Sequence, residues 1–331
     1  MRRRDILAVL GATLLCPREI TAHEPDAVRR VAWFGLGQPA TASPYVEALR
    51  AGLRERGWIE GKNVVLDVHW AGGRNDMEAA AHKILASNPD VIVTQEFMTL
   101  AMQAVHADKP VVFGFSGDPV LAKLVESWAR PGGNFTGLTY LALELVGKRV
   151  EVLKECVPHL RRLAVLARPQ HPGEHLEREA TEAVVRRLGM ELAYFPYLGS
   201  SLPARDFADL DQTLRSIGSA HCDGLLVFPD SAMFEVNDRV SRFALEARLP
   251  SVSGWSPFAR DGLLLSYGPD VRDLYRTLGH YVDRILHGTP AAILPVQVPS
   301  QVEMVINLKT AKALGLTIPS TIIVRADEVI E

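Results

Sequence analysis

The stretch FGFSGDPVLAKLVESWARPGGNFTGLTY, residues 113–140, decides the fold of this chain. An apolar run over 111–115 predicts a buried strand, which ends in the polar residues 116–119. The spacing of apolar residues over 121–128 predicts a short amphipathic helix, and a glycine-rich turn then leads into a second series of strands and helices. A polar loop, a helix N-terminus and a chain crossover thus lie together, and a ligand cleft between two lobes needs all three.

Strand and helix patterns alternate on both sides of this stretch. Strands are predicted before it at 31–34, 66–70, 91–93 and 111–113, and after it at 163–166, 192–195, 225–228 and 251–253. Helical stripes of apolar residues separate these strands, which implies parallel sheets with right-handed crossovers. Two such series along one chain predict an α/β fold of two Rossmann-like, doubly wound lobes.

The last part of the chain has too few elements for a third domain. It predicts a strand at 263–267, a helix stripe at 274–285, a proline-rich span at 290–299, a strand at 302–306 and a short helix at 311–316. We expect these elements to return to the two lobes, so that several strands cross a shared hinge. The predicted N-terminal lobe is 28–140 with 266–297, and the predicted C-terminal lobe is 141–265 with 298–331.

The first 22 residues have the pattern of an export signal. Three arginines precede the apolar run Ile6 to Leu15, polar residues follow, and cleavage is expected after Ala22. About ten apolar residues are too few to span a bilayer, which takes roughly 20. The paired arginines suggest the twin-arginine route. Cys16 is a poor lipid-anchor site because Leu15 stands where a small residue is expected, and a disordered amphipathic N-terminus is the alternative interpretation. We therefore predict a periplasmic protein.

The composition is that of an ordinary globular protein, with 47% hydrophobic and 23% charged residues. A net charge of −3 argues against a general nucleic-acid binder. Outside the signal the cysteines are Cys156 and Cys222, which an exported protein could pair, although their place beside predicted core elements favours buried free thiols. No metal-binding spacing occurs: His171 and His175 are four residues apart, but a proline and a glycine separate them.

In open parallel sheets, ligands bind beyond the carboxyl ends of the strands, where helix N-termini offer free N–H groups. The polar and aromatic residues that follow the predicted strands are therefore the candidate ligand-binding residues: Gln38, Ser43, Thr94, Gln95, Ser116, Asp118, Arg168, Asp230 and Trp255. Glu96 and Phe97 stand in the same loop as Gln95, and Phe97 is expected to shape the pocket.

Several of these candidates have a purely structural alternative. Ser43 and Asp118, like Asp270, precede predicted helices and could act only as N-caps. Asp230 is either a cap or a ligand acid, and Trp255 either stacks on a ligand or fills the seam between the lobes. Arg168 is the best cation for a ligand carboxylate, although surface arginines are common.

The search for catalytic and cofactor motifs is negative. The sequence contains no G-x-S-x-G elbow, no H-E-x-x-H motif and no Walker lysine loop, and Gly35-x-Gly37 lacks the third glycine of a dinucleotide fingerprint. We therefore predict a protein that is not an enzyme and uses no cofactor or metal. An enzyme of two Rossmann-like domains and a ligand-sensing domain for a membrane receptor remain the alternatives.

Four ordered motifs resemble one family of ABC transporter substrate-binding proteins. They are SGDPVLAKLVESWARPGGNFTGLTY at 116–140, LRERGWIEGKNVVLDVHWAGG at 53–73, LLLSYGPDVRDLYR at 263–276, and LPVQVPSQVEMVINLKTAKALGLTIPSTIIVRADEVIE at 294–331. The resemblance covers almost the whole chain after the signal. In that family, residues 95–98, Gln-Glu-Phe-Met here, are usually a run of small residues, often with Thr-Pro, so this chain departs from the pattern where a loop should face the cleft.

The resemblance implies a type I periplasmic-binding fold, with two lobes joined by three crossing strands and a ligand bound between them. It implies an ABC permease and ATPase as partners, and a ligand that is an amino acid, aromatic or branched, or an aromatic or other small organic acid. By position it assigns Ser116, Asp118 and Asp230 to the pocket. We expect a monomer that closes its lobes on the ligand without a covalent step.

Overall fold

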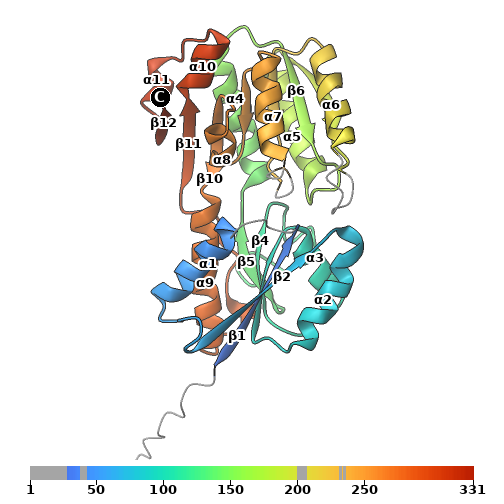
Figure 1. Ribbon diagram of the computed structural model, residues 1–331, viewed down its shortest axis with the longest axis vertical. Helices are drawn as coiled ribbons and strands as arrows, with labels where there is room; N and C mark the ends of the chain where they lie inside the picture. The colour runs from blue at the N-terminus through green and yellow to red at the C-terminus, as the bar shows by residue number, and fades with distance from the viewer. Residues whose placement is uncertain (1–27, 38–42, 200–206, 231–232, 234–235) are drawn as a thin grey trace, which may run out of the picture.

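The computed structural model describes residues 28–37, 43–199, 207–230, 233 and 236–331, and it has two α/β lobes stacked along the long axis of the molecule (Figure 1). The predicted signal, residues 1–22, lies outside the described residues. Among those residues, no helix is long and apolar enough to cross a membrane.

The first lobe is built on a five-stranded parallel sheet with the strand order β2-β1-β3-β4-β5. Its strands are β1 (Arg29–Leu36), β2 (Val64–Ala71), β3 (Val91–Gln95), β4 (Val111–Phe115) and β5 (Phe135–Thr139), and its helices are α1 (Pro44–Glu55), η1 (Arg74–Asp76), α2 (Met77–Ala86) and α3 (Phe97–Ala104). Alternate residues of the apolar run in β1 enter different cores: Val31 and Trp33 pack with α1, whereas Ala32 and Phe34 pack with α2 and α3. Helices therefore cover both faces, as the continuous apolar run predicts.

The second lobe has a seven-stranded sheet with the order β12-β11-β10-β9-β8-β6-β7. Its strands are β6 (Arg162–Ala167), β7 (Glu191–Pro196), β8 (Gly224–Val227), β9 (Ser251–Ser253), β10 (Leu265–Pro269), β11 (Val302–Asn307) and β12 (Glu328–Ile330). Its helices are α4 (Ala142–Cys156), α5 (Glu174–Arg187), α6 (Ala208–Ser219), α7 (Asn237–Glu246), α8 (Ser256–Arg260), α10 (Leu308–Leu314) and α11 (Ser320–Ile323). All neighbouring strands are parallel except β10 and β11, which are antiparallel, so the sheet is mixed rather than purely parallel.

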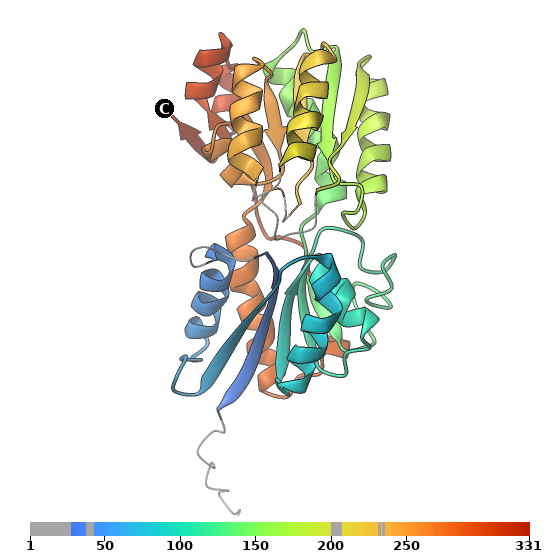
Figure 2. The ribbon, with the colours of Figure 1, turned by 45° about the vertical axis from the view of Figure 1, so that its right-hand side comes forward.

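The chain crosses between the lobes at three places, which Figure 2 shows side by side. It leaves the first lobe after β5, returns after β10 into α9 (Val271–Leu286), and leaves again after η3 (Ala291–Ile293) to enter β11. Helix α9 packs against α1 and beneath β4, so it belongs to the core of the first lobe. Helix α9 thus lies in the first lobe, whereas β10, β11 and β12 lie in the second sheet. The predicted residue boundaries of the lobes stay a proposal.

The predicted helix over 121–128 is wrong, because this segment is a series of turns. The Asp118 carboxylate accepts hydrogen bonds from the backbone N–H groups of Val120 and Leu121, at 2.7 and 3.1 Å. Lys123 then adopts a φ of 57°, which breaks any helical repeat. Local side-chain capping and a left-handed residue thus outweigh the apolar spacing.

Both cysteines outside the predicted signal are free thiols in the structure. Cys156 is buried in the core of the second lobe, as predicted, whereas Cys222 is only half-buried. Burial raises the pKa of the Cys156 thiol to about 12, so this group stays protonated and packs as an apolar side chain.

Candidate functional site

The carboxyl ends of the strands in the two lobes meet at a buried polar contact. Ser116 follows β4 in the first lobe, and His171 lies in the loop after β6 in the second. The Ser116 Oγ lies 2.6 Å from His171 Nε2 and 2.7 Å from Glu96 Oε2, and the Ser116 N–H also points at Glu96 Oε2 at 3.3 Å. All three side chains are at least 96% buried. The lobes are therefore in direct contact at this point.

The direction of each hydrogen bond in this contact follows from the number of protons that the groups carry. The Ser116 hydroxyl has one proton, and it donates it to the Glu96 carboxylate, so His171 Nε2–H donates to the Ser116 oxygen. A nucleophilic serine needs the opposite arrangement, with its proton directed at the imidazole. The contact therefore joins the lobes through hydrogen bonds and does not activate Ser116.

The imidazole of His171 sits among acidic groups. Burial opposes its charged form, but the Glu96 carboxylate, 3.7 Å from His171 Nε2, and the charges of Asp230 and Glu177 outweigh burial and raise the pKa of His171 to about 9. On its other side, His171 Nδ1 lies 3.7 Å from Glu177 Oε1. Burial raises the pKa of Glu177 to about 7, although His171 and Arg149 oppose the shift. His171 therefore carries a positive charge at neutral pH.

Two predicted candidates come together in the second lobe. Arg168 follows β6, Asp230 follows β8, and the Arg168 Nη1 lies 3.7 Å from Asp230 Oδ2. The side chains are 11% and 1% exposed, so this ion pair lies in a desolvated place. A cation and an anion side by side at the strand ends suit a ligand that carries both charges.

An aromatic cluster lies at the seam where the two lobes meet. The hydroxyls of Tyr140 and Tyr275 lie 2.6 Å apart, and Trp255 packs edge-on against Tyr140 with ring centroids 5.9 Å apart. Tyr275 also lies 5.2 Å from the rings of Trp33 and of Tyr45. Trp255 is only 1% exposed, and its predicted ligand-binding role stays a proposal.

The other predicted candidates make separate contacts or lie outside the described residues. Thr94 is buried and its Oγ1 lies 2.9 Å from that of Thr99, whereas Gln95 is buried at the end of β3. Asp118 caps a turn, and Ser43 occupies the N-cap position of α1 without a side-chain capping bond. Gln38 lies outside the described residues. The ligand-binding roles of all these candidates stay proposals.

Sequence reasoning considered His171 only as a metal ligand and so missed its place in the lobe contact. The signal was present, because His171 follows the same strand as Arg168 and the strand-end rule applies to the whole loop. No cluster of metal-ligating side chains occurs within the described residues.

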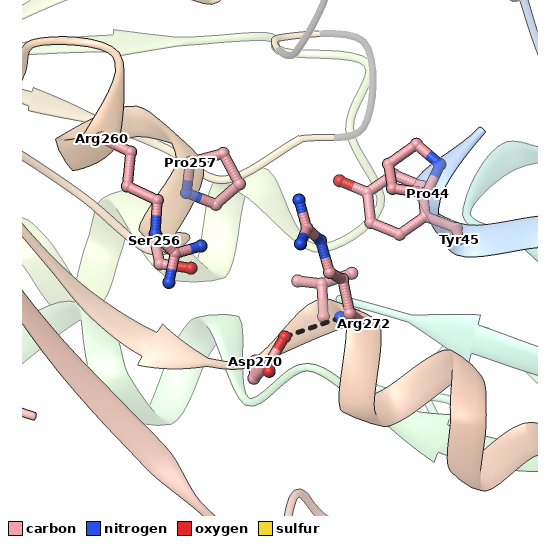
Figure 3. Close-up of a pocket in the computed structure, with 8 residues that line it drawn as sticks. Pro44, Tyr45, Ser256, Pro257, Arg260, Asp270 and Arg272 are labelled. Carbon is pink, nitrogen blue, oxygen red and sulfur yellow. Dashed lines mark hydrogen bonds between the residues drawn. The ribbon is translucent and has the colours of Figure 1, made fainter. Parts of the chain in front are cut away.

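A pocket of about 210 Å³ opens between the lobes beside the hinge (Figure 3). Pro44 and Tyr45 at the start of α1 form one wall, and Ser256 and Pro257 at the start of α8 form the other. The Arg272 side chain extends between these walls in Figure 3. Asp270, at its edge, accepts hydrogen bonds from two backbone N–H groups of α9, which is the N-cap role predicted as one alternative.

A family model described as "ABC transporter substrate binding protein" matches residues 39–330. The chain belongs to this family of substrate-binding proteins. The family is one of binding proteins rather than enzymes, and its members bind small ligands and work with ABC transporter components. The predicted fold class and the resemblance stated above are thereby confirmed.

Individual relatives cover most of the chain. A tyrosine-binding protein of Clostridioides difficile is 25% identical over 271 residues, which is 80% of this chain and 74% of that protein. A conserved domain protein of Vibrio cholerae has a TM-score of 0.81 and 27% identity, covering 91% of this chain and 99% of that one. The structure of an ABC domain from Streptococcus pneumoniae in complex with L-Trp has a TM-score of 0.81 and 22% identity, covering 92% and 100%.

Proposed function

We propose that this protein is the extracytoplasmic solute-binding component of an ABC importer and that it captures an amino acid, aromatic or branched, or a related organic acid between its lobes. Its predicted export signal supports the location, and the ligand would pass to a permease and ATPase at the membrane. The observation that carries the proposal is the seam itself, where the Arg168–Asp230 ion pair and the Trp255–Tyr140 contact lie at the carboxyl ends of the strands.

The relatives support the ligand class. The C. difficile relative is named for tyrosine, and the S. pneumoniae neighbour was solved with L-Trp. An aromatic ring buries 150–250 Å² and suits a seam lined by tyrosine and tryptophan. A ligand that touches both lobes favours the closed state by the difference between its affinities for the closed and open forms.

Amino acids are expected to stabilise the protein against heat. A ligand present at 100 times its Kd should add about 2.7 kcal/mol to the free energy of unfolding. The measurement is a thermal-shift screen of the purified mature chain with aromatic and branched amino acids, aromatic acids, sugars and nucleosides. If a sugar or nucleoside stabilises the protein and no amino acid or carboxylate does, the proposed ligand class is wrong.

Asp230→Ala is expected to weaken binding of whichever amino acid stabilises the wild type by about 10-fold or more, since a hydrogen bond to a charged group contributes about 1.5–3 kcal/mol. Calorimetry measures the effect. Asp238→Ala, which removes a largely exposed carboxylate on α7, is the matched control and should bind normally. Equal affinities for the two variants would reduce Asp230 to a structural role.

A further inference from the structure

Glu96 has an unusual backbone conformation at the entrance to α3. Its φ of 46° and ψ of −118° lie outside the regions that residues with a Cβ normally occupy, so the backbone is strained here. The conformation directs the Glu96 carboxylate back toward the end of β4. Strain of this kind persists where the surrounding structure requires it, and it clusters at ligand-binding sites.

The Glu96 carboxylate accepts the hydrogen bonds that Ser116, the residue after β4, can donate. Its Oε2 accepts from both the N–H and the hydroxyl of Ser116. In the absence of an acid at position 96, these two donors would be available to a ligand carboxylate. A second carboxylate brought to the same place would instead meet a like charge in a desolvated environment, which is strongly unfavourable.

The second carboxylate oxygen of Glu96, Oε1, lacks a hydrogen-bond donor among the described residues. The Glu96 side chain is only 1% exposed, and Oε1 itself is buried. A buried acceptor without a hydrogen bond destabilises the protein, and more so when it is charged. A ligand that donates a hydrogen bond here offsets this destabilisation, and a positively charged donor offsets the most.

The neighbouring rings suit a cation. Burial raises the pKa of the Tyr140 and Tyr275 phenols, and the charge of Glu96 adds to this effect, so both rings stay neutral. Neutral aromatic rings attract ammonium groups through their faces. The cation that approaches Glu96 in the described part of the chain is His171, at 3.7 Å, and it belongs to the other lobe. Opening of the lobes therefore leaves Glu96 without it.

We propose that Glu96 is the specificity-determining residue of the first lobe and that it binds the protonated amine of the ligand. This inference rests on the proposed function and narrows it: amino acids and amines are ligands, whereas organic acids without an amine are not. The departure from the family pattern at 95–98 thus places an acidic side chain where the family usually has small residues.

Three compounds with the same phenol ring test this inference: L-tyrosine, tyramine, which lacks the carboxylate, and 3-(4-hydroxyphenyl)propanoate, which lacks the amine. We expect L-tyrosine and tyramine to bind the wild-type mature chain in calorimetry and the propanoate to bind at least 10-fold more weakly. In Glu96→Gln the two amines should lose about 10- to 100-fold in affinity, as expected for loss of a charge-assisted hydrogen bond, while the propanoate loses nothing. Glu78→Gln, on the exposed surface of α2, is the matched control.

The outcomes separate the inference from the proposed function. If the propanoate binds the wild type as tightly as the amines, or if Glu96→Gln binds the amines with unchanged affinity, the inference is wrong and the proposed function stands. If none of the three compounds binds and no other amino acid stabilises the protein, both are wrong. The comparison of ligands on the wild type needs no variant, so it can overturn the inference even if Glu96→Gln does not fold.

Discussion

Replacing Gly52 by leucine is expected to destabilise the protein by at least about 3 kcal/mol, at or beyond the upper end of what overpacking usually costs. Gly52 lies on the face of α1 that packs on α9, and a Cβ added there would overlap the backbone carbonyl of Arg276. Gly279 on α9 faces Gly52 in turn, so the two backbones meet with no side chain between them. Because backbone cannot move aside as a side chain does, the helices must separate.

Urea unfolding of the mature chain measures this effect as a lower midpoint. Gly133→Ala is the matched control, because Gly133 is exposed, has an ordinary φ, and an added Cβ there would meet nothing within 4 Å. It should change the midpoint little. A Gly52→Leu protein with the wild-type midpoint would mean that α1 and α9 are not held at this distance in solution.

The glycine contact illustrates what the sequence could and could not predict. The apolar stripe of α9 was predicted from its helical spacing, and so was its return to an existing lobe. The partner of that stripe was not predictable, because a glycine carries no hydrophobic signal and the contact joins residues more than 220 positions apart. Periodicity identifies which face of a helix is buried, but it does not identify what covers that face.

The residues at the strand ends could likewise be predicted only in part. The apolar runs predicted where the strands end, and the strand-end rule then collected Ser116, Arg168 and Asp230, which the structure places beside the seam. The antiparallel entry of β11 was missed because its apolar pattern is the same in either direction. Asp118 was correctly given a capping alternative, but the turn that it caps replaced a predicted helix.

His171→Gln is expected to lower the free energy of unfolding by several kcal/mol at pH 6, since removing one partner of a buried charge pair typically costs about 3–5 kcal/mol. Glutamine can still donate to Ser116, but it removes the imidazolium charge that Glu96 and Asp230 stabilise. His82→Gln, on the exposed face of α2, is the matched control.

The same variant should change how stability depends on pH. The pKa of His171 is raised from 6.5 to about 9 in the folded protein, so its stabilising contribution is complete below pH 6.5 and is lost as pH rises through 9. The pKa of Glu177 is raised from 4.5 to about 7, and this group also contributes less as pH rises. The folded protein therefore binds more protons than the unfolded chain over this range, and the wild type should lose stability between pH 6 and 9.5.

Urea midpoints at pH 6, 7.5 and 9.5 test the argument. The wild type and His82→Gln should show the full decline, whereas His171→Gln should show a smaller one, confined mainly to the range below pH 8 where Glu177 titrates. A decline of equal size in His171→Gln would mean that the imidazole is not charged in the folded protein. The contact between Ser116 and His171 would then join the lobes as a neutral hydrogen bond, and its loss would cost only about 1 kcal/mol.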